Sequence, residues 1–331
     1  LLNSKKERIL SITHQQDIDG LFCGAILKNA FPDTLVYLTN YGYRNILNIA
    51  NTIETNITKS KKQGTIIISD LSVDNTEEAS IIKSAGIKAT ARGWNFFWID
   101  HHAWRPEVKD MIKSFATVVL SEEKDKKCAS ELICDIFDIK RTACTRMAKF
   151  AHIADFRLPE LSNMPPLPEM VRYYSTFSDH YRKLQSIINK ASSGIFWDNE
   201  LQAEYESKYL PQKDLAIKEA LKSLMVTSIH EYKVAVIEAP KILSKGILSE
   251  LVYNLYDDVD IVILFSPDGK ISIRRKPDSE IRCDLIAQKL NGGGHSYAAA
   301  GIIKSPIYLE NSKTRTINVQ DVIRALQVVL A

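Results

Sequence analysis

The stretch Phe96-Phe97-Trp98-Ile99-Asp100-His101-His102 joins a run of apolar, strand-forming residues to three side chains that can bind a metal ion. Four large apolar residues in a row predict a buried strand. The polar end indicates that this strand leads into a functional site. A capped strand end with one surface histidine and one core histidine would give the same sequence, so the rest of the chain has to decide between the two interpretations.

Polar side chains of the same kind follow two earlier predicted strands. Residues 8–13 are predicted to form a strand, and residues 20–29 a helix, with His14-Gln15-Gln16-Asp17-Ile18-Asp19-Gly20 between them. Residues 64–70 form a run rich in β-branched residues that ends in Asp70. Taken alone, an Asp-rich turn that caps a helix would also explain the first of these motifs.

The alternation of predicted strands and helices indicates a mainly parallel sheet with right-handed crossovers. Further strands are expected at residues 35–38 and 117–120, and helices at residues 44–55 and from residue 75 onward. The carboxyl ends of parallel strands meet at one edge of the sheet, where ligands bind. We therefore expect one site formed by His14, Asp17, Asp19, Asp70, Asp100, His101 and His102. Asp155, at the end of a predicted helix, could add a further acid above it.

The composition is that of an ordinary soluble protein with room for two domains. The chain has 331 residues, of which 45% are hydrophobic and 25% charged. No apolar run approaches the length of a membrane-spanning helix, and no signal-peptide pattern opens the chain. Five cysteines form no Cys-x-x-Cys pair, so we expect a cytoplasmic protein without disulfides. The net charge of +3 permits a polyanionic partner without requiring one.

The last part of the chain differs in character from the first. We expect a first domain over residues 1–195, a helical linker over 196–228 and a second, smaller domain over 229–331. The second contains Gly292-Gly293-Gly294-His295, preceded by Arg274-Arg275 on a predicted strand. Glycine amides, guanidinium groups and an imidazole suit a phosphate group. A flexible turn beside a solvated basic strand is the alternative.

In this order the motifs resemble the DHH phosphoesterase family, in the subgroup that carries a second domain of the DHHA1 type. The resemblance covers nearly the whole chain. It implies an α/β fold in which a mainly parallel sheet has helices on both faces, and a smaller α/β domain lies across a cleft. The motifs that carry it are His14-x-x-Asp17-x-Asp19-Gly20, Asp70, Asp100-His101-His102, Asp155 and Gly292-Gly293-Gly294-His295.

The resemblance also implies roles for these residues in phosphoester hydrolysis with two manganese ions, for which magnesium could substitute. One ion would be held by His14, Asp17 and Asp70, and the other by Asp19, Asp70, His101 and Asp155, so that Asp70 bridges. His102 would contact the scissile phosphate, and Asp100 would orient the histidines. Substrate would be bound by Arg274, Arg275, Gly293, Gly294 and His295. Carboxylates and imidazoles without thiolates favour manganese or magnesium over structural zinc.

Three functions remain open within this resemblance. The Asp17-Ile18-Asp19-Gly20 form and the basic helix at residues 141–149 favour an archaeal RecJ-like exonuclease that acts on single-stranded DNA or RNA. Some archaeal relatives bind a replication-complex partner such as the GINS assembly. The alternative is a nanoRNase that degrades very short oligonucleotides or 3′,5′-bisphosphate nucleotides. A non-catalytic replication scaffold is the third, which the retained acids disfavour.

Overall fold

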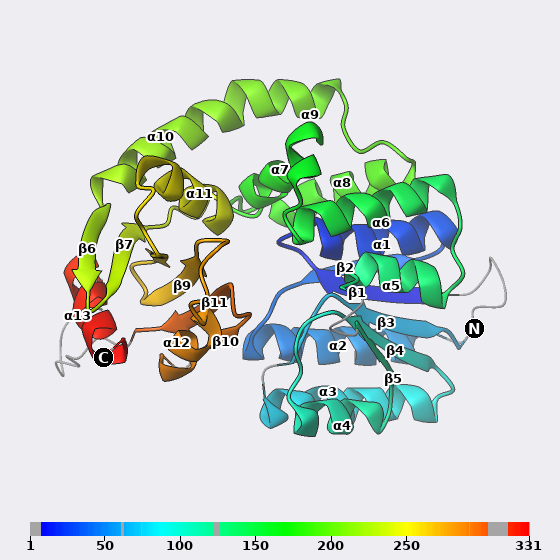
Figure 1. Cartoon of the computed structure of the whole chain (residues 1–331). Helices are drawn as coiled ribbons and strands as arrows, with labels where there is room; N and C mark the ends of the chain where they lie inside the picture. Colours follow the sequence, from blue (N-terminus) through cyan, green and yellow to red (C-terminus); the bar gives the residue numbers. More distant parts are fainter. Residues whose placement is uncertain are drawn as a thin grey trace. The chain divides into compact units, whose positions relative to one another are not determined.

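The computed structural model describes residues 8–60, 63–73, 75–121, 126–290, 292–303 and 317–330. The chain forms two compact units, which divide between Gln202 and Ala203. Figure 1 shows the course of the chain, and each unit is described by itself.

The first unit is built on a five-stranded parallel sheet with the strand order β2-β1-β3-β4-β5. The mainly parallel sheet expected from the sequence is therefore confirmed. Strands β1 and β3 are buried along their whole length, because both faces of such a sheet are covered. The strands are β1 (Ile9–His14), β2 (Leu35–Thr39), β3 (Thr65–Ser69), β4 (Asn95–Asp100) and β5 (Thr117–Leu120).

Helices cover both faces of this sheet (Figure 1). On one face lie α1 (Ile18–Ala30), α5 (Ala129–Ile136) and α6 (Thr142–Asp155), and on the other α2 (Tyr43–Lys59), α3 (Thr76–Ala91) and α4 (Pro106–Lys113). Side chains alternate between the faces along each strand. Ile66, Ile68 and Trp98 accordingly belong to one apolar core with α2, α3 and α4. The expected helices on both faces are confirmed.

Four short helical segments complete this unit or lead out of it: η1 (Pro159–Asn163), α7 (Leu167–Tyr174), α8 (His180–Ser192) and α9 (Asn199–Glu204). Helix α8 covers the outer strand β2, where the side chains of Tyr181 and Gln185 donate hydrogen bonds to the carbonyl oxygen of Val36 at 3.3 and 2.9 Å. These bonds occupy a backbone acceptor that an edge strand would otherwise expose.

The second unit contains a six-stranded sheet with the order β10-β11-β9-β8-β7-β6, in which only β7 and β8 run parallel among the described pairs. Val234 and Val236 face the core beneath α12 and α13, whereas Ala235 and Ile237 face α10 and α11. The elements are η2 (Tyr205–Tyr209), α10 (Leu210–Lys222), β6 (Met225–Ile229), β7 (Tyr232–Glu238), α11 (Lys245–Leu255), β8 (Ile261–Phe265), β9 (Lys270–Arg275), α12 (Cys283–Lys289), β10 (Gly293–Gly294), β11 (Ala298–Ile302) and α13 (Val319–Val329). Strand β6 lies partly within the expected linker, yet it pairs with β7 in the sheet.

None of the helices in the described ranges is long and apolar enough to cross a membrane.

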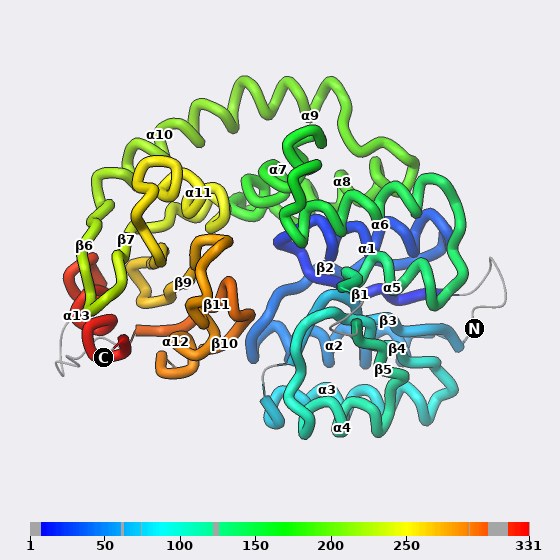
Figure 2. Tube along the Cα trace, in the orientation of Figure 1, coloured from blue at the N-terminus to red at the C-terminus, as the bar shows by residue number. Residues whose placement is uncertain are grey.

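The strand order of the first sheet also fixes where a ligand can reach it. Strand β1 lies between β2 and β3, so the chain reverses its direction of winding there. At such a switch point the loops after neighbouring strands diverge and leave a crevice at their carboxyl ends. Figure 2 traces the loops that leave β1, β3 and β4 at that end of the sheet.

Candidate metal centre

The carboxyl ends of β1, β3 and β4 lie level with one another. Thr13 is the register partner of Ser69, and Ser69 that of Ile99. The next residues along the three strands are His14, Asp70 and Asp100. The first unit therefore brings together the polar strand ends that the sequence placed in one site.

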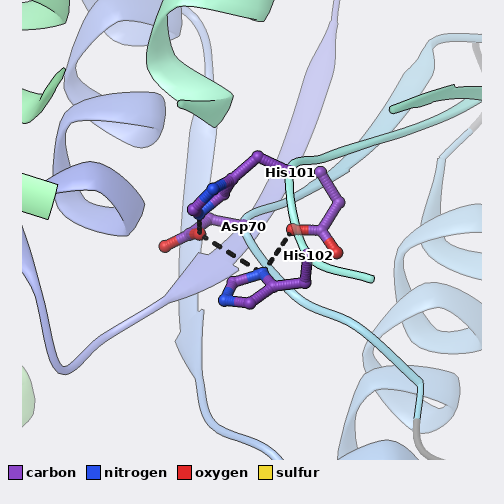
Figure 3. Close-up of side chains that lie close together, drawn as sticks. Asp70, His101 and His102 are labelled. Carbon is purple, nitrogen blue, oxygen red and sulfur yellow. Dashed lines mark hydrogen bonds and ion pairs between the residues drawn. The ribbon is translucent and has the colours of Figure 1, made fainter. Parts of the chain in front are cut away.

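Asp70 is the central acid of this edge. It is 1% exposed, and its backbone has a φ of 55°, a left-handed conformation that Asp tolerates better than most residues. Its amide donates to the carbonyl oxygen of Ile99 at 3.0 Å, which fixes the turn after β3. Figure 3 shows its carboxylate directed at His101 and His102. Such a conformation at a buried charged residue is typical of functional sites.

His101 lies among three carboxylates. Its Nε2 is 3.3 Å from Oδ1 of Asp70 and 3.9 Å from Oδ2 of Asp19, and its Nδ1 is 3.6 Å from Oδ2 of Asp155. Oδ2 of Asp70 and Nε2 of His101 are both buried without a hydrogen-bond partner. Buried polar atoms are usually satisfied, so two unsatisfied ligand atoms in one cluster fit a cation-binding site.

The pKa values of the acids are consistent with this charge crowding. Burial, followed by repulsion from Asp17 and Asp19, raises the pKa of Asp70 well above its usual range. Burial also raises the pKa of Asp155 to about 7, where attraction to His101 is opposed by repulsion from Asp19. A divalent ion would remove this repulsion and keep the carboxylates charged.

Asp19 has a second structural role that the sequence did not reveal. Its Oδ2 accepts a hydrogen bond from the amide of Ala129 at 2.8 Å, and its Oδ1 accepts one from the amide of Ser130 at 2.9 Å. The hydroxyl of Ser130 donates to the carbonyl oxygen of Asp19 at 3.0 Å. Asp19 thus holds the N-terminus of α5, where a negative charge is favourable. Each carboxylate oxygen keeps a further lone pair for a metal ion.

His14 and Asp17 form a separate pair beside this cluster. Nε2 of His14 is 3.4 Å from Oδ2 of Asp17, while Oδ1 of Asp17 accepts a hydrogen bond from the amide of Gly20 at 2.9 Å. Asp17 is therefore a helix cap as well as a candidate ligand. Burial lowers the pKa of His14, which favours the neutral imidazole that metal binding requires. A Cβ on Gly20 would lie 2.4 Å from the carbonyl oxygen of His14, so only glycine fits there.

Asp100 holds His102 in a defined orientation. Its Oδ1 accepts a hydrogen bond from Nδ1 of His102 at 2.8 Å, and its Oδ2 accepts one from Nε1 of Trp104 at 2.7 Å. Burial acts to lower the pKa of His102, but attraction to Asp100 outweighs it and raises the value to about 9. Because Nδ1 is engaged, Nε2 is the ring nitrogen that is available to a substrate.

Tyr41 and Trp104 are the residues of this site that sequence reasoning missed. The hydroxyl of Tyr41 lies 3.4 Å from Nε2 of His102, and the Trp104 indole binds Asp100. Their positions in the sequence could have revealed them. Tyr41 follows β2, which ends at the same edge of the sheet, and Trp104 closely follows the histidine pair. A search for acids and histidines does not find them.

The second unit brings together its own set of predicted residues. Arg274 and Arg275 end β9, which pairs with β11, and β11 in turn pairs with β10, formed by Gly293 and Gly294. The ring of His295 stacks on that of Tyr297, with centroids 5.2 Å apart. The amide of Arg275 donates to the carbonyl oxygen of Tyr297 at 3.3 Å. All five predicted substrate-binding residues therefore lie at one end of this sheet.

The three glycines at positions 292–294 differ in whether packing and backbone conformation require glycine there. A Cβ on Gly292 would lie 1.9 Å from the carbonyl oxygen of Ala300, and Gly294 has a φ of 141°. A Cβ on Gly293 would meet nothing within 4 Å. Packing therefore explains Gly292 and Gly294, whereas Gly293 leaves open backbone that a ligand could approach.

Residues 231–327 match the DHHA1 domain family. The second unit resembles a DHHA1 domain. The comparison with curated proteins finds no match. Among solved structures, the pGpG-specific phosphodiesterase PggH from Vibrio cholerae has a TM-score of 0.53 at 13% identity, with 98% of each chain covered. This likeness shows a shared fold.

Two further solved structures have lower TM-scores. An uncharacterized protein from Helicobacter pylori G27 has a TM-score of 0.45 at 17% identity, with 98% of this chain and 99% of that chain covered. CDC45 from Entamoeba histolytica has a TM-score of 0.44 at 9% identity, with 98% of this chain and 94% of that chain covered.

Proposed function

We propose that this chain is a metal-dependent phosphoesterase of the DHH type that hydrolyses phosphodiester bonds in short oligonucleotides. The observation that carries the proposal is the cluster of Asp70, Asp100, His101 and His102, whose ligand atoms all lie within 4.8 Å of one another. The cluster lies at the carboxyl ends of β3 and β4, next to the switch point of the sheet.

The residues present fit divalent ions of the manganese or magnesium type. The donors are carboxylate oxygens and imidazole nitrogens, and Oδ2 of Asp70 and Nε2 of His101 are buried without partners. Asp70 has one oxygen towards His101 and a second oxygen to offer to another ion, so it is suited to bridge. We assign His14 and Asp17 to one ion, and Asp19, His101 and Asp155 to the other. When bound, the ions supply Lewis-acid activation of the phosphoryl group and of water.

The protein's own groups hold and polarise the substrate. Asp100 fixes Nδ1 of His102, so Nε2 is presented to the phosphate and carries a proton below the pKa of about 9. A protonated imidazole stabilises the negative charge that develops on a phosphate oxygen. In the second unit Arg275, Gly293 and His295 offer a guanidinium group, an open backbone and an imidazole to a further phosphate or to the terminal nucleotide.

Two observations support short substrates. PggH, which shares the fold over 98% of both chains, is described as a phosphodiesterase specific for pGpG. Two cations of the basic segment at residues 141–149, which the sequence suggested as a track for a longer strand, have partners within the protein. Arg141 donates to the carbonyl oxygen of Asn29, and the guanidinium of Arg146 lies 4.9 Å above the ring of Phe196.

A RecJ-like exonuclease is the second candidate. Arg146 and Lys149 are exposed on α6, which ends at Asp155 in the candidate metal centre. With a rise of about 1.5 Å per residue, they lie about 13 and 9 Å from Asp155 along the helix axis. Cations at that distance suit phosphates beyond the scissile one. A replication-complex partner stays a prediction from the family resemblance.

The test is hydrolysis of an end-labelled dinucleotide by chelator-treated protein to which manganese or magnesium is returned. We expect turnover to depend on the added ion and to be lost in Asp70→Asn, which keeps the shape of the side chain and tolerates the left-handed backbone. Turnover that survives chelation, or no cleavage of any strand between two and about twenty residues long, would contradict the proposal.

A further inference from the structure

Tyr41 lies in the loop after β2 and is held there from several sides. Its amide donates to the side chain of Asn40 at 2.9 Å, and its carbonyl oxygen accepts a hydrogen bond from the side chain of Asn45 at 2.8 Å. Its ring packs against that of His14, with centroids 4.7 Å apart, and meets that of His102 edge-on at 6.0 Å. The phenol is therefore fixed relative to both histidines.

The packing of Tyr41 on His14 needs only the aromatic ring, so the hydroxyl group requires another explanation. That hydroxyl lies 3.4 Å from Nε2 of His102. A strong hydrogen bond between these atoms would be about 2.8 Å long, so the observed contact is longer than a strong hydrogen bond. The opposite ring nitrogen is held by Asp100 at 2.8 Å, which prevents the imidazole from turning to shorten the contact.

Two donors at this separation can bind one acceptor between them. An oxygen about 2.8 Å from the tyrosine oxygen and about 2.8 Å from Nε2 forms an ordinary hydrogen bond with each. Tyrosine is neutral at pH 7 and keeps its O–H, and Nε2 carries a proton whenever the imidazole is charged. The acceptor that benefits most is an anionic oxygen, because bonds to charged acceptors are the stronger ones.

We propose that the Tyr41 hydroxyl and Nε2 of His102 together hold one non-bridging oxygen of the phosphate that is cleaved. This inference rests on the proposed function and adds a catalytic residue to it. Tyr41 would bind the phosphate directly, on the side of the site formed by β1, β2 and β4. Asp100 and Asn45 would act through it or through His102 as positioning residues.

The test compares Tyr41→Phe with Tyr43→Phe. The first change removes only the hydroxyl and keeps the ring that packs on His14. The second removes a hydroxyl from an exposed tyrosine two residues further on, at the start of α2, and serves as the matched control. Inorganic phosphate is the probe, titrated by calorimetry into protein loaded with manganese. Turnover of a dinucleotide, manganese affinity and the melting temperature are measured beside it.

We expect Tyr41→Phe to weaken phosphate binding about 10- to 100-fold and to lower turnover by a similar factor, with manganese affinity and melting temperature unchanged. Tyr43→Phe should match the wild type in all four measurements. Wild-type phosphate affinity in Tyr41→Phe would overturn the proposal, and so would a loss of manganese in parallel, because Tyr41 would then act through His14. If the wild type binds phosphate but cleaves no oligonucleotide, the proposed function fails while the phosphate titration still decides the role of Tyr41.

Discussion

Asp100 accepts a hydrogen bond from Nδ1 of His102 at 2.8 Å while its other oxygen accepts one from Trp104. The carboxylate is fully buried, and both of its oxygens are engaged. Asp100 could lie near a metal ion by distance alone, because its ligand atom belongs to the same cluster as those of Asp70 and His101. Because its hydrogen bonds hold His102, we propose that Asp100 orients this histidine and is not a metal ligand.

Replacing Asp100 by Asn should separate these two roles. The amide group of Asn can accept from only one of the two donors, and its own NH₂ opposes the other. We expect turnover to fall about 10- to 100-fold with metal content unchanged, as is usual when a supporting hydrogen bond is lost. Trp104→Phe, which removes only the bond to Oδ2, should have a smaller effect. Metal content is measured by elemental analysis and turnover by kinetics. Loss of metal from Asp100→Asn would show that Asp100 is a metal ligand.

The stability of the metal-free protein should respond in opposite directions to removal of charge from Asp70 and from Asp19. Asp70→Asn relieves a crowded, buried carboxylate whose pKa is raised, so its melting temperature in chelator should rise. Asp19→Ala removes the acceptor for two amides at the N-terminus of α5, so it should lower the free energy of unfolding by about 1 kcal/mol. Thermal unfolding in chelator measures both. A lower melting temperature for Asp70→Asn would show that its charge is already compensated without metal.

Metal-free protein should become less stable as the pH rises from about 6.5 to about 8.5. Asp155, with its pKa raised to about 7, is favoured in the protonated form by folding, and this contribution is lost as the pH rises through that value. His102, with its pKa raised from 6.5 to about 9, is favoured in the charged form by folding, and its contribution is lost over the same range and above. The pKa of His14 is lowered, so this residue changes the pH dependence of stability only below its ordinary pKa of 6.5, outside this range.

Excess magnesium should remove the part of this dependence that Asp155 contributes, because the ion binds the deprotonated carboxylate, whereas the part contributed by His102 should remain. Melting temperatures at the two pH values, with chelator and with excess magnesium, give the comparison. Asp155→Asn should show a smaller dependence in chelator than the wild type. A wild-type protein whose melting temperature in chelator increases over this range would contradict the predicted charge states.

Gly293 provides a test of the second unit that leaves packing untouched. A methyl group at this position meets nothing within 4 Å, so Gly293→Ala should fold normally, yet it would obstruct a substrate that approaches the backbone. We expect a higher KM for Gly293→Ala and for His295→Ala with unchanged metal content. Gly292→Ala, in which the new Cβ would meet the carbonyl oxygen of Ala300, should instead lower stability. A fall in metal content for His295→Ala would place this residue among the ligands.

The convergence of the polar strand ends followed from sequence because it depends on one rule. If the strands are parallel, the residues after β1, β3 and β4 must share an edge, whatever the details of packing. The alternation of strands and helices was strong enough to establish that condition. The same local signals located α1, α2, β2 and β5 to within a few residues.

Contacts between distant segments could not be derived in this way. The bonds from Asp19 to α5 join residues 110 and 111 positions apart, and nothing in either segment specifies the other. Tyr41 was missed for the same reason, because its role depends on how the loop after β2 places a phenol beside His102. Strand β11 consists of alanine and glycine apart from Ile302, so it has few of the β-branched residues by which strands are recognised, and its pairing with β9 and β10 defines it.

Substrate length separates the two enzymatic functions. We expect kcat/KM for a dinucleotide to exceed that for a single strand of about twenty residues, because Arg141 and Arg146 already have partners within the protein. On this view Lys149→Ala and Arg146→Ala leave dinucleotide turnover unchanged. A RecJ-like enzyme would behave differently, since each cation that contacts a phosphate of a long strand steepens the salt dependence of binding by about 0.7 in log–log slope. A strong preference for the longer strand, together with a shallower slope in Lys149→Ala, would replace the short-substrate proposal with the exonuclease.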